Sequence, residues 1–272
     1  IKLAGGKVKK IPTTIGDDFK ISPKKLINAI TPRTKLLILN SPNNPSGAVY
    51  TQEELKALGK IIAENKHLIV LSDDVYERIY LHHEHPAPHL MQSLPKLRKQ
   101  CLIVNSLSKT YAMTGWRLGY ACGPKKLIEA MSKIQSQIGG ASSSIAQRAG
   151  IDALSKQSQA CIAEMLNKYE QRHQVLCQRL DQIPLFDYIP AKGAFYIFVN
   201  IKQAMDALHI QNDVVFCEKL LQEARVSCVA GTPFGLPHHM RISFATKKAK
   251  IHEAFDRIET LLSSHTTTST AE

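Results

Sequence analysis

The sequence predicts an α/β protein in which a three-layer, mostly parallel sheet is followed by a smaller C-terminal α+β domain. Three short apolar runs, at residues 36–40, 69–73 and 102–106, are typical of strands that are covered on both faces. About thirty residues separate the first two runs, enough chain for a right-handed parallel crossover through a helix. After residue 158 the pattern changes to β-rich segments with helices between them, so a second domain is expected there.

Residues 51–66 are predicted to form the helix of the first crossover. Thr51 and Glu54 match a capping box, in which each side chain accepts a hydrogen bond from the backbone N–H of the other residue. The rest of the helix presents one apolar stripe, which we expect to pack against the sheet. The stripe consists of Leu55, Leu58, Ile61 and Ile62.

A second helix is predicted to begin at Gly123 and Pro124, because proline is favoured in the first turn of a helix. Only a short segment joins Val104 to Leu118, which leaves too little chain for a crossover helix. We therefore expect residues 117–123 to pair antiparallel with the third strand. The apolar face of the second helix consists of Leu127, Ile128, Met131 and Ile134.

Three regions are expected along the chain. Residues 1–157 are predicted to form a partial large domain, and residues 158–262 a long linking helix with the small domain. Residues 263–272 are polar and unpatterned, so a disordered tail is expected. The chain begins at Ile1 within a strand-and-turn pattern and without the features of a signal peptide, so we expect an N-terminal part to be missing.

The formal net charge of +12 raises the question of nucleic-acid binding. The lysines are spread over many predicted helix faces, without a dense tract or an aromatic RNA-binding motif. We interpret the excess as solvated surface, helped by a site that attracts anions, and expect no nucleic-acid partner. No apolar run approaches the roughly 18 residues that a membrane span requires, so no membrane association is expected.

Cysteine and histidine usage argues against a metal site. The six cysteines are widely scattered, contain no C-x-x-C pair and mostly lie in apolar runs. This favours reduced, buried thiols in a cytoplasmic protein over a disulfide framework or a zinc site. The segment HHEHPAPH at residues 82–89 contains prolines and lacks helical spacing, which favours an exposed loop over a metal site.

Polar residues follow each of the three predicted strands. In an open α/β sheet, ligands bind outside the carboxyl ends of the strands, so these residues are candidates for one site. The strand ends deliver, in order, Asn44, then Asp73 and Tyr76, then Ser106, Ser108 and Lys109.

Each group also has an ordinary interpretation. Residues 41–47 have the composition of a turn, Asp73 and Asp74 could cap a following helix, and an isolated lysine is usually exposed. Lys109, however, follows a buried strand and has Arg117 nearby. A lysine that is desolvated at such a position can attack carbonyl groups, which favours a nucleophile.

Together these residues supply a reactive amine, a carboxylate, a phenol, an amide and a phosphate-binding group. The phosphate-binding residue types are Ser106, Ser108 and Arg117. This set meets the needs of pyridoxal 5′-phosphate (PLP), which requires a lysine for covalent attachment and a carboxylate to keep its ring nitrogen protonated.

The resemblance to a known family becomes specific at these segments. In order, NSPNNPSGAVY, LSDDVYE, SLSKTYAMTGWRLGYACGP, AKGAFYIF, VAGTPFG and MRISFAT resemble the class I aminotransferases of PLP-dependent fold type I. The likeness is greatest to the bacterial aspartate aminotransferase branch, which includes aromatic and prephenate-using members, and extends from residue 1 to about residue 262. It implies that residues 1–157 are part of the PLP-binding large domain, and that an N-terminal third of the family's chain is missing.

The resemblance implies a role for each candidate residue. Lys109 would bind the cofactor covalently and carry protons to and from the substrate. Asp73 would pair with the cofactor's ring nitrogen, while Asn44 and Tyr76 would contact its ring oxygen.

Two further roles depend on the resemblance. Ser106, Ser108 and Arg117 would hold the phosphate, and Arg241, together with Asn44, would bind the carboxylate of the substrate. From the residues alone, Arg241 is a polar residue in the alternating segment MRISFAT, and a surface strand explains it equally well.

The predicted activity is transamination between an L-amino acid, aspartate, and a 2-oxo acid such as 2-oxoglutarate, in a homodimer. Two alternatives stay open. One keeps the cofactor but changes the reaction to that of a β-lyase or a synthase. The other is a truncated, inactive homologue that acts as a binding protein, which is motivated by the missing N-terminal segment.

Overall fold

The computed structural model describes residues 1–266 and separates into two compact units. The first unit comprises Ile1–Pro42, Ala48–Tyr80 and Glu84–Ala163. The second comprises Asn43–Gly47, Leu81–His83 and the described chain from Glu164 onward. The boundary expected after residue 157 therefore falls a little later, after Ala163, and two short loop segments join the second unit.

The first unit contains a four-stranded sheet in the order β1-β2-β3-β4. The first three strands are parallel, and β4 pairs antiparallel with β3, as the short connection predicts. Asn40 pairs with Asp73, and Asp73 pairs with Val104, so the carboxyl ends of the parallel strands lie along one edge of the sheet. The bounds are β1 Leu36–Asn40, β2 Ile69–Asp73, β3 Cys101–Ser106 and β4 Gly119–Cys122.

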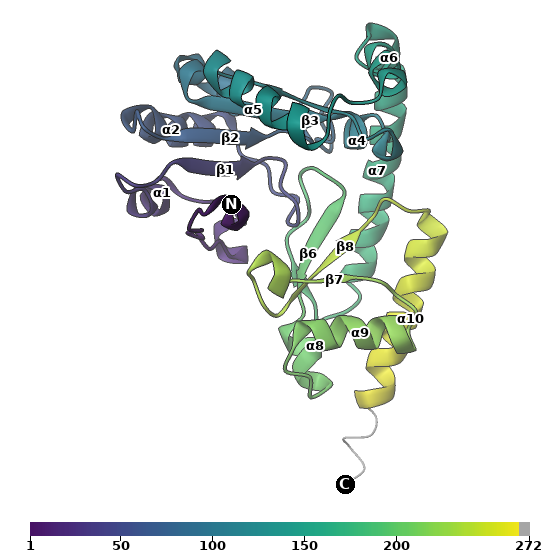
Figure 1. Cartoon of the computed structure of the whole chain (residues 1–272). Helices are drawn as coiled ribbons and strands as arrows, with labels where there is room; N and C mark the ends of the chain where they lie inside the picture. The colour runs from purple at the N-terminus through teal and green to yellow at the C-terminus, as the bar shows by residue number, and fades with distance from the viewer. Residues whose placement is uncertain (267–272) are drawn as a thin grey trace. The chain divides into compact units, whose positions relative to one another are not determined.

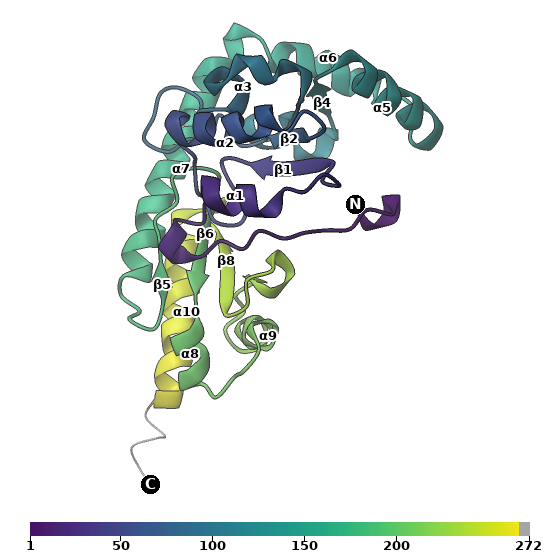
Figure 2. The same cartoon turned by 90° about the vertical axis from the view of Figure 1, so that its left-hand side faces the viewer.

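Three helices cover one face of this sheet, and α2 lies in front of the strands in Figure 2. The predicted capping box of α2 is confirmed: Thr51 N donates to Glu54 Oε2 at 2.8 Å, and Glu54 N to Thr51 Oγ1 at 3.2 Å. The predicted stripe of α2 is buried in a core with Leu39 and Val70. The bounds are α1 Pro23–Ala29, α2 Gln52–Glu64 and α3 Leu90–Ser93.

The opposite face of the sheet is less covered than expected. On the edge strand β1, Leu36 and Ile38 are exposed, because no described helix packs over them. The expectation that all three runs are buried on both faces is therefore wrong for β1. Likewise, α5 (Lys125–Ile138) has its predicted stripe on one face, but Met131 and Ile134 are exposed and no residue of the helix is buried.

The first unit also contains short helices and turns. Between β3 and β4 lie the short helix α4 (Leu107–Thr110) and a 3₁₀ turn, Thr114–Trp116. The helix α6 (Ser144–Ala153) follows α5. Other 3₁₀ turns are Lys2–Ala4, Ile15–Asp17, Pro95–Lys99 and Lys156–Ser158.

The second unit is an antiparallel sheet with helices (Figure 1), in the order β5-β6-β8-β7. The predicted long helix is α7 (Gln159–Leu180), which begins in the first unit and continues in the second. Phe216, Phe244 and Phe255 are fully buried in this unit. The other elements are β5 Asp187–Tyr188, β6 Tyr196–Asn200, α8 Lys202–Ala207, α9 Asp213–Glu223, β7 Val229–Ala230, a 3₁₀ turn at Thr232–Phe234, β8 His239–Ser243 and α10 Lys248–Thr266.

The prediction of disorder from residue 263 onward is wrong for residues 263–266, which continue α10. Ile258, Leu261 and Leu262 anchor the preceding turns in the core, and each residue added to an existing helix gains a backbone hydrogen bond. Residues 267–272 lie outside the described residues.

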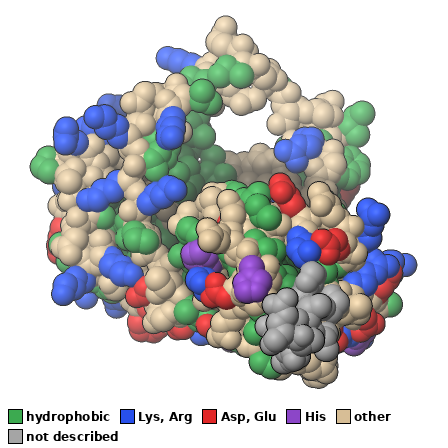
Figure 3. Space-filling view, turned by 90° about the horizontal axis from the view of Figure 1, so that it is seen from below, with side chains coloured by type: hydrophobic (Ala, Val, Ile, Leu, Met, Phe, Trp, Pro, Cys, Tyr) green, Lys and Arg blue, Asp and Glu red, His purple; other side chains and the backbone are tan. Residues whose placement is uncertain are grey.

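The cysteines are unpaired, but they are not all buried as expected. Cys122 and Cys161 are exposed, whereas Cys101 and Cys217 are buried. Among residues 1–266, no helix is both long and apolar enough to cross a membrane. Lys and Arg side chains are scattered over the face shown in Figure 3.

Candidate active site

Asp73 lies at the carboxyl end of β2, beside β3. The backbone around it is fixed by two hydrogen bonds, from Asn40 Nδ2 to Asp73 O at 2.9 Å and from Asp74 N to Val104 O at 3.0 Å. The side chain is half-buried, and this desolvation raises the pKa of Asp73, while a 3.4 Å hydrogen bond from Val75 N to Oδ1 opposes the shift. A carboxylate in this environment gains from a cationic partner.

The alternative in which Asp73 and Asp74 cap a helix is wrong, because residues 75–78 form turns. Asp74 is buried and accepts a 2.8 Å hydrogen bond from Ser72 Oγ. The pKa of Asp74 is raised to about 7, mainly by burial; the hydrogen bond from Ser72 opposes the shift, and the charges of Glu77 and Asp73 add to it. The predicted cofactor residue Tyr76 is also buried in this segment.

Lys109 lies in the short helix α4, just beyond the carboxyl end of β3, and β3 pairs with the strand that carries Asp73. Ser106 begins the helix α4, because its Oγ accepts a 3.2 Å hydrogen bond from Ser108 N. Leu107 N donates to Leu118 O at 3.1 Å and ties the start of α4 to the chain entering β4. Lys109 is half-buried, so the interpretation as an ordinary exposed lysine is wrong.

Ser106 ends β3, and Ser108 and Arg117 lie on the connection from β3 to β4. Arg117 is exposed, has a left-handed backbone with φ of 53°, and donates from Nη1 to Thr114 O at 3.0 Å. Gly119 pairs with Ser106, and a Cβ on Gly119 would lie 3.3 Å from Ser106 Cβ. This close packing fixes the backbone at Ser106. The hydroxyls of Ser106 and Ser108 and the guanidinium of Arg117 are groups that can bind an anion.

In the second unit, Arg241 and Asn44 are in direct contact. Arg241 Nη1 donates to Asn44 Oδ1 at 2.8 Å, and the guanidinium carbon lies 4.4 Å from the centre of the Tyr196 ring and 5.2 Å from that of Phe234. Arg241 is half-buried on the inner strand β8, so the surface-strand interpretation is wrong. Its Nε is buried and has no hydrogen-bond partner among the described residues.

The turn that carries Asn44 is fastened to the second unit. Lys192 N and Gly193 N each donate to Gly47 O at 3.0 Å. Gly47 has φ of +70°, and a Cβ there would lie 2.4 Å from Ala191 Cβ, so only glycine fits without movement. The peptide bonds before Pro42 and Pro45 are cis.

Each unit thus gathers part of the predicted set. The first unit holds Asp73, Tyr76, Ser106, Ser108, Lys109 and Arg117, and the second holds Asn44 and Arg241. Reasoning from sequence missed Tyr196 and Phe234 as the aromatic partners of Arg241. The contact between Tyr196 and Arg241 results from the strand register. Phe198 on β6 pairs with Arg241 on β8, so Tyr196, two residues earlier on β6, lies diagonally opposite Arg241 on the same face of the sheet. The sequence does not reveal this register.

Comparisons with known proteins identify the family of the chain. Residues 1–258 match the family model for aminotransferase class I and II. The chain is 41% identical over 269 residues to an aspartate/prephenate aminotransferase of Nitrosomonas europaea and 39% identical over 266 residues to an aspartate aminotransferase of Bacillus subtilis. Each alignment covers 97% of this chain and 67% of the relative.

A solved structure of Thermus thermophilus aspartate aminotransferase with maleate superposes with a TM-score of 0.85 at 36% identity, covering 94% of this chain and 64% of that one. The chain thus spans about two thirds of the length of these relatives. It belongs to the aminotransferase class I and II family. Family members of the aspartate type are PLP-dependent.

The residues of the chain fit this cofactor. Asp73 ends β2 and Lys109 follows the adjacent parallel strand β3, and both residues are half-buried. The hydroxyls of Ser106 and Ser108 and the guanidinium of Arg117 suit a phosphate. In the second unit, the unpartnered Nε of Arg241 suits a carboxylate.

Proposed function

We propose that the chain catalyses transamination between L-aspartate and a 2-oxo acid such as 2-oxoglutarate, using PLP. The observation that carries the proposal is the placement of Asp73 and Lys109 just at and beyond the carboxyl ends of two adjacent parallel strands. Ligands of open α/β sheets bind at this edge. The family and the names of the relatives support the reaction class.

In this proposal Lys109 holds the cofactor covalently and moves the proton at the substrate's α-carbon. The bound cofactor supplies an electron sink for the charge that develops there. Asp73 keeps the ring nitrogen protonated, since a half-buried carboxylate is stabilised by a neighbouring cation. Tyr76 and Asn44 hold the ring oxygen.

Ser106, Ser108 and Arg117 hold the phosphate. Ser106 Oγ already accepts a backbone hydrogen bond, so its hydroxyl proton stays available to a phosphate oxygen. The exposed guanidinium of Arg117 adds charge to the same connection.

Arg241 binds the α-carboxylate of the substrate with its planar guanidinium. Asn44 orients the group by accepting from Nη1, and Nε is left as a donor for a carboxylate oxygen. The Thermus relative is named with maleate, a dicarboxylate, which supports an acidic substrate. We also propose a homodimer and, because the described cysteines are unpaired, a cytoplasmic location.

The direct test is chemical labelling. The full chain is incubated with PLP, reduced with sodium borohydride and digested, and the pyridoxyl-labelled peptide is identified by mass spectrometry. We expect the label on Lys109, and a label on another lysine would overturn the proposal. Release of ammonia and pyruvate without a 2-oxo acid would instead indicate an elimination reaction.

A further inference from the structure

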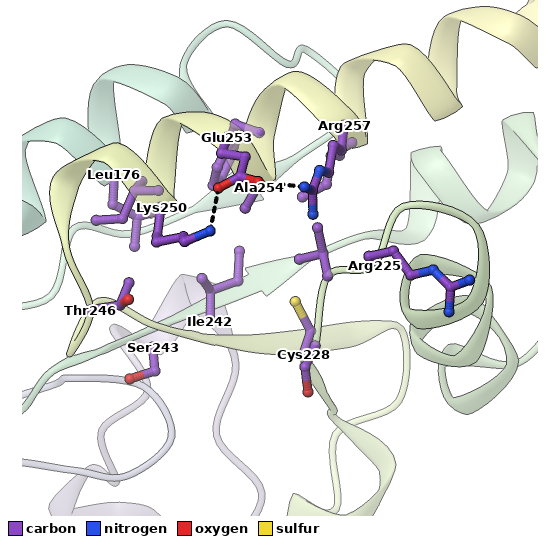
Figure 4. A pocket seen from close by; sticks show the side chains of 15 residues that line it. Leu176, Arg225, Cys228, Ile242, Ser243, Thr246, Lys250, Glu253, Ala254 and Arg257 are labelled. Carbon is purple, nitrogen blue, oxygen red and sulfur yellow. Dashed lines mark hydrogen bonds and ion pairs between the residues drawn. The ribbon is translucent and has the colours of Figure 1, made fainter.

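A hollow of about 290 Å³ lies in the second unit, and none of the residues assigned above lines it. It is bounded by α10, by β8 and by the segment that joins α9 to β7 (Figure 4). All of its lining residues belong to the second unit, so the hollow is a feature of that unit alone. Because a water molecule takes about 30 Å³ of liquid, the volume is enough for a small organic molecule.

Much of the lining is apolar. Phe255, Ile251 and Ile258 are buried on the inner side of α10, and Leu176 of α7 is buried beside them. Ile242 contributes from β8. Such a lining favours an apolar group by removing its surface from water.

Charged groups at the hollow are predominantly positive. Arg225, Lys250 and Arg257 line it together with one acid, Glu253. In Figure 4, Lys250 and Arg257 both reach Glu253: Lys250 Nζ lies 2.7 Å from Oε2, and Arg257 Nη2 contacts Oε1. Lys250 and Arg257 thus share the one carboxylate of Glu253, so positive charge exceeds negative charge there. Arg225 makes no ion pair with any of the described residues, and its guanidinium is directed away from Glu253 (Figure 4).

Two polar residues add to the lining: Thr246 on the approach to α10 and Ser227 in the α9–β7 segment. Ser243 also borders the hollow, but it follows Ile242 on β8 and its side chain points to the other side of the strand (Figure 4). Hydroxyl donors and positive charge around an apolar lining are suited to a ligand that is anionic at one end and apolar at the other.

We propose that this hollow binds a small organic anion, with a carboxylate or phosphate group near Lys250 and Arg257 and an apolar body against Ile242 and Phe255. The hollow shares no lining residue with the proposed active site, although Ile242 follows Arg241 on β8. A cationic ligand is disfavoured by Lys250 and Arg257, and a purely apolar ligand leaves their excess positive charge uncompensated.

The test uses the full chain with phenyl phosphate and benzoate as probes, and benzyl alcohol as the uncharged control. Binding is measured by isothermal titration and by the amide NMR signals of Ser227 and Cys228, which line the hollow. We expect at least one anion to bind about tenfold or more tightly than benzyl alcohol, and the tighter anion identifies the preferred head group. Equal binding of the alcohol, or no anion binding tighter than about 10 mM, overturns the proposal.

Three variants tie the binding to the hollow. The double variant Lys250→Gln/Arg257→Gln should weaken the better probe about tenfold, and Glu253→Gln should strengthen it several-fold by releasing both cations. Lys247→Gln, which removes an exposed charge outside the hollow, is the matched control and should change little. Circular dichroism confirms folding of each variant. Equal losses in the control and the double variant would show that general surface charge attracts the probe, and would overturn the proposal.

Discussion

Arg241 Nη1 donates a 2.8 Å hydrogen bond to Asn44 Oδ1 across 197 residues of sequence. Both residues belong to the second unit, and the turn that carries Asn44 is fastened there through Gly47. The ring of Tyr196 lies against the guanidinium. The arginine is therefore oriented by the protein itself, and substrate binding need not supply that ordering.

Arg241→Lys is expected to raise the KM for aspartate by about 10- to 100-fold, with a much smaller change in kcat. Lysine keeps the charge but loses the planar set of donors, and hydrogen bonds to charged groups contribute about 1.5–3 kcal/mol. Steady-state kinetics of aspartate with 2-oxoglutarate measure the effect. Arg33→Lys, at an exposed position in the first unit, is the control. An unchanged KM would remove Arg241 from the substrate site.

Lys109→Arg is expected to lower kcat by at least about 10²- to 10⁴-fold, the range that a positioned acid–base group contributes. Arginine keeps the positive charge but is neither a nucleophile nor a proton carrier at neutral pH. The coupled transaminase assay and borohydride labelling give two independent readouts. Lys126→Arg, on the exposed surface of α5, should retain both activity and label. A fully active Lys109→Arg variant would refute the assignment.

Gly47→Ala is expected to destabilise the second unit by about 2–5 kcal/mol. The new Cβ would meet Ala191 Cβ at 2.4 Å, and φ of +70° is unfavourable for alanine. The thermal midpoint measured by circular dichroism should fall by about 4–20 °C, at about 2–4 °C per kcal/mol.

Two further glycines separate the causes of that effect. Gly140 has φ of +62°, and a Cβ added there would have nothing within 4 Å, so Gly140→Ala should cost only the backbone contribution of about 1–2 kcal/mol. Gly115 has open space and no positive φ, so Gly115→Ala should be nearly neutral. If Gly47→Ala lowers the free energy of unfolding by no more than Gly140→Ala does, the close contact with Ala191 contributes nothing to the loss of stability.

Asp74 should make the stability of the first unit fall as the pH rises from about 4 to about 7. Its folded-state pKa of about 7 lies above the ordinary aspartate value of 3.8, so in this range the unfolded chain loses a proton that the folded chain keeps. Since one pKa unit corresponds to about 1.4 kcal/mol, the loss is on the order of 4 kcal/mol at most. Above about pH 8 the contribution is constant.

Asp74→Asn should remove this dependence, because the amide oxygen can still accept from Ser72 and no charge is buried. Urea unfolding followed by the fluorescence of Trp116, the single tryptophan, measures stability at about pH 5 and about pH 8. Asp152→Asn is the control, since Asp152 is exposed on α6. The same slope with pH in Asp74→Asn and the unsubstituted chain would show that another group titrates.

The local signals in the sequence predicted the elements well. Thr51 and Glu54 predicted the start of α2, and the short stretch between Val104 and Leu118 predicted the antiparallel β4. The sequence could not predict that Leu36 and Ile38 are exposed. An apolar residue in a strand carries no information about which segment of the chain covers it. A continuous apolar run therefore predicts burial on both faces of the sheet, whether or not a helix packs on each face.

The candidate site was predictable in part. Strand ends identified Asp73 and Lys109, because the carboxyl edge of a parallel sheet follows from strand order alone. The attachment of Asn44 to the second unit was not predictable. It depends on Gly47 meeting residues 191–193, a contact between distant segments that leaves no periodic signal in either.

The apolar side chains exposed on β1 and α5 have a practical consequence for the colloidal behaviour of the protein. Large apolar side chains that are exposed on an edge strand and on a helix promote adhesion between copies. The net charge of +12 opposes that adhesion through long-range repulsion. Salt at about 0.1 M shortens the range of this repulsion to about 10 Å. We therefore expect the protein to aggregate least when it is dilute and in low-salt buffer.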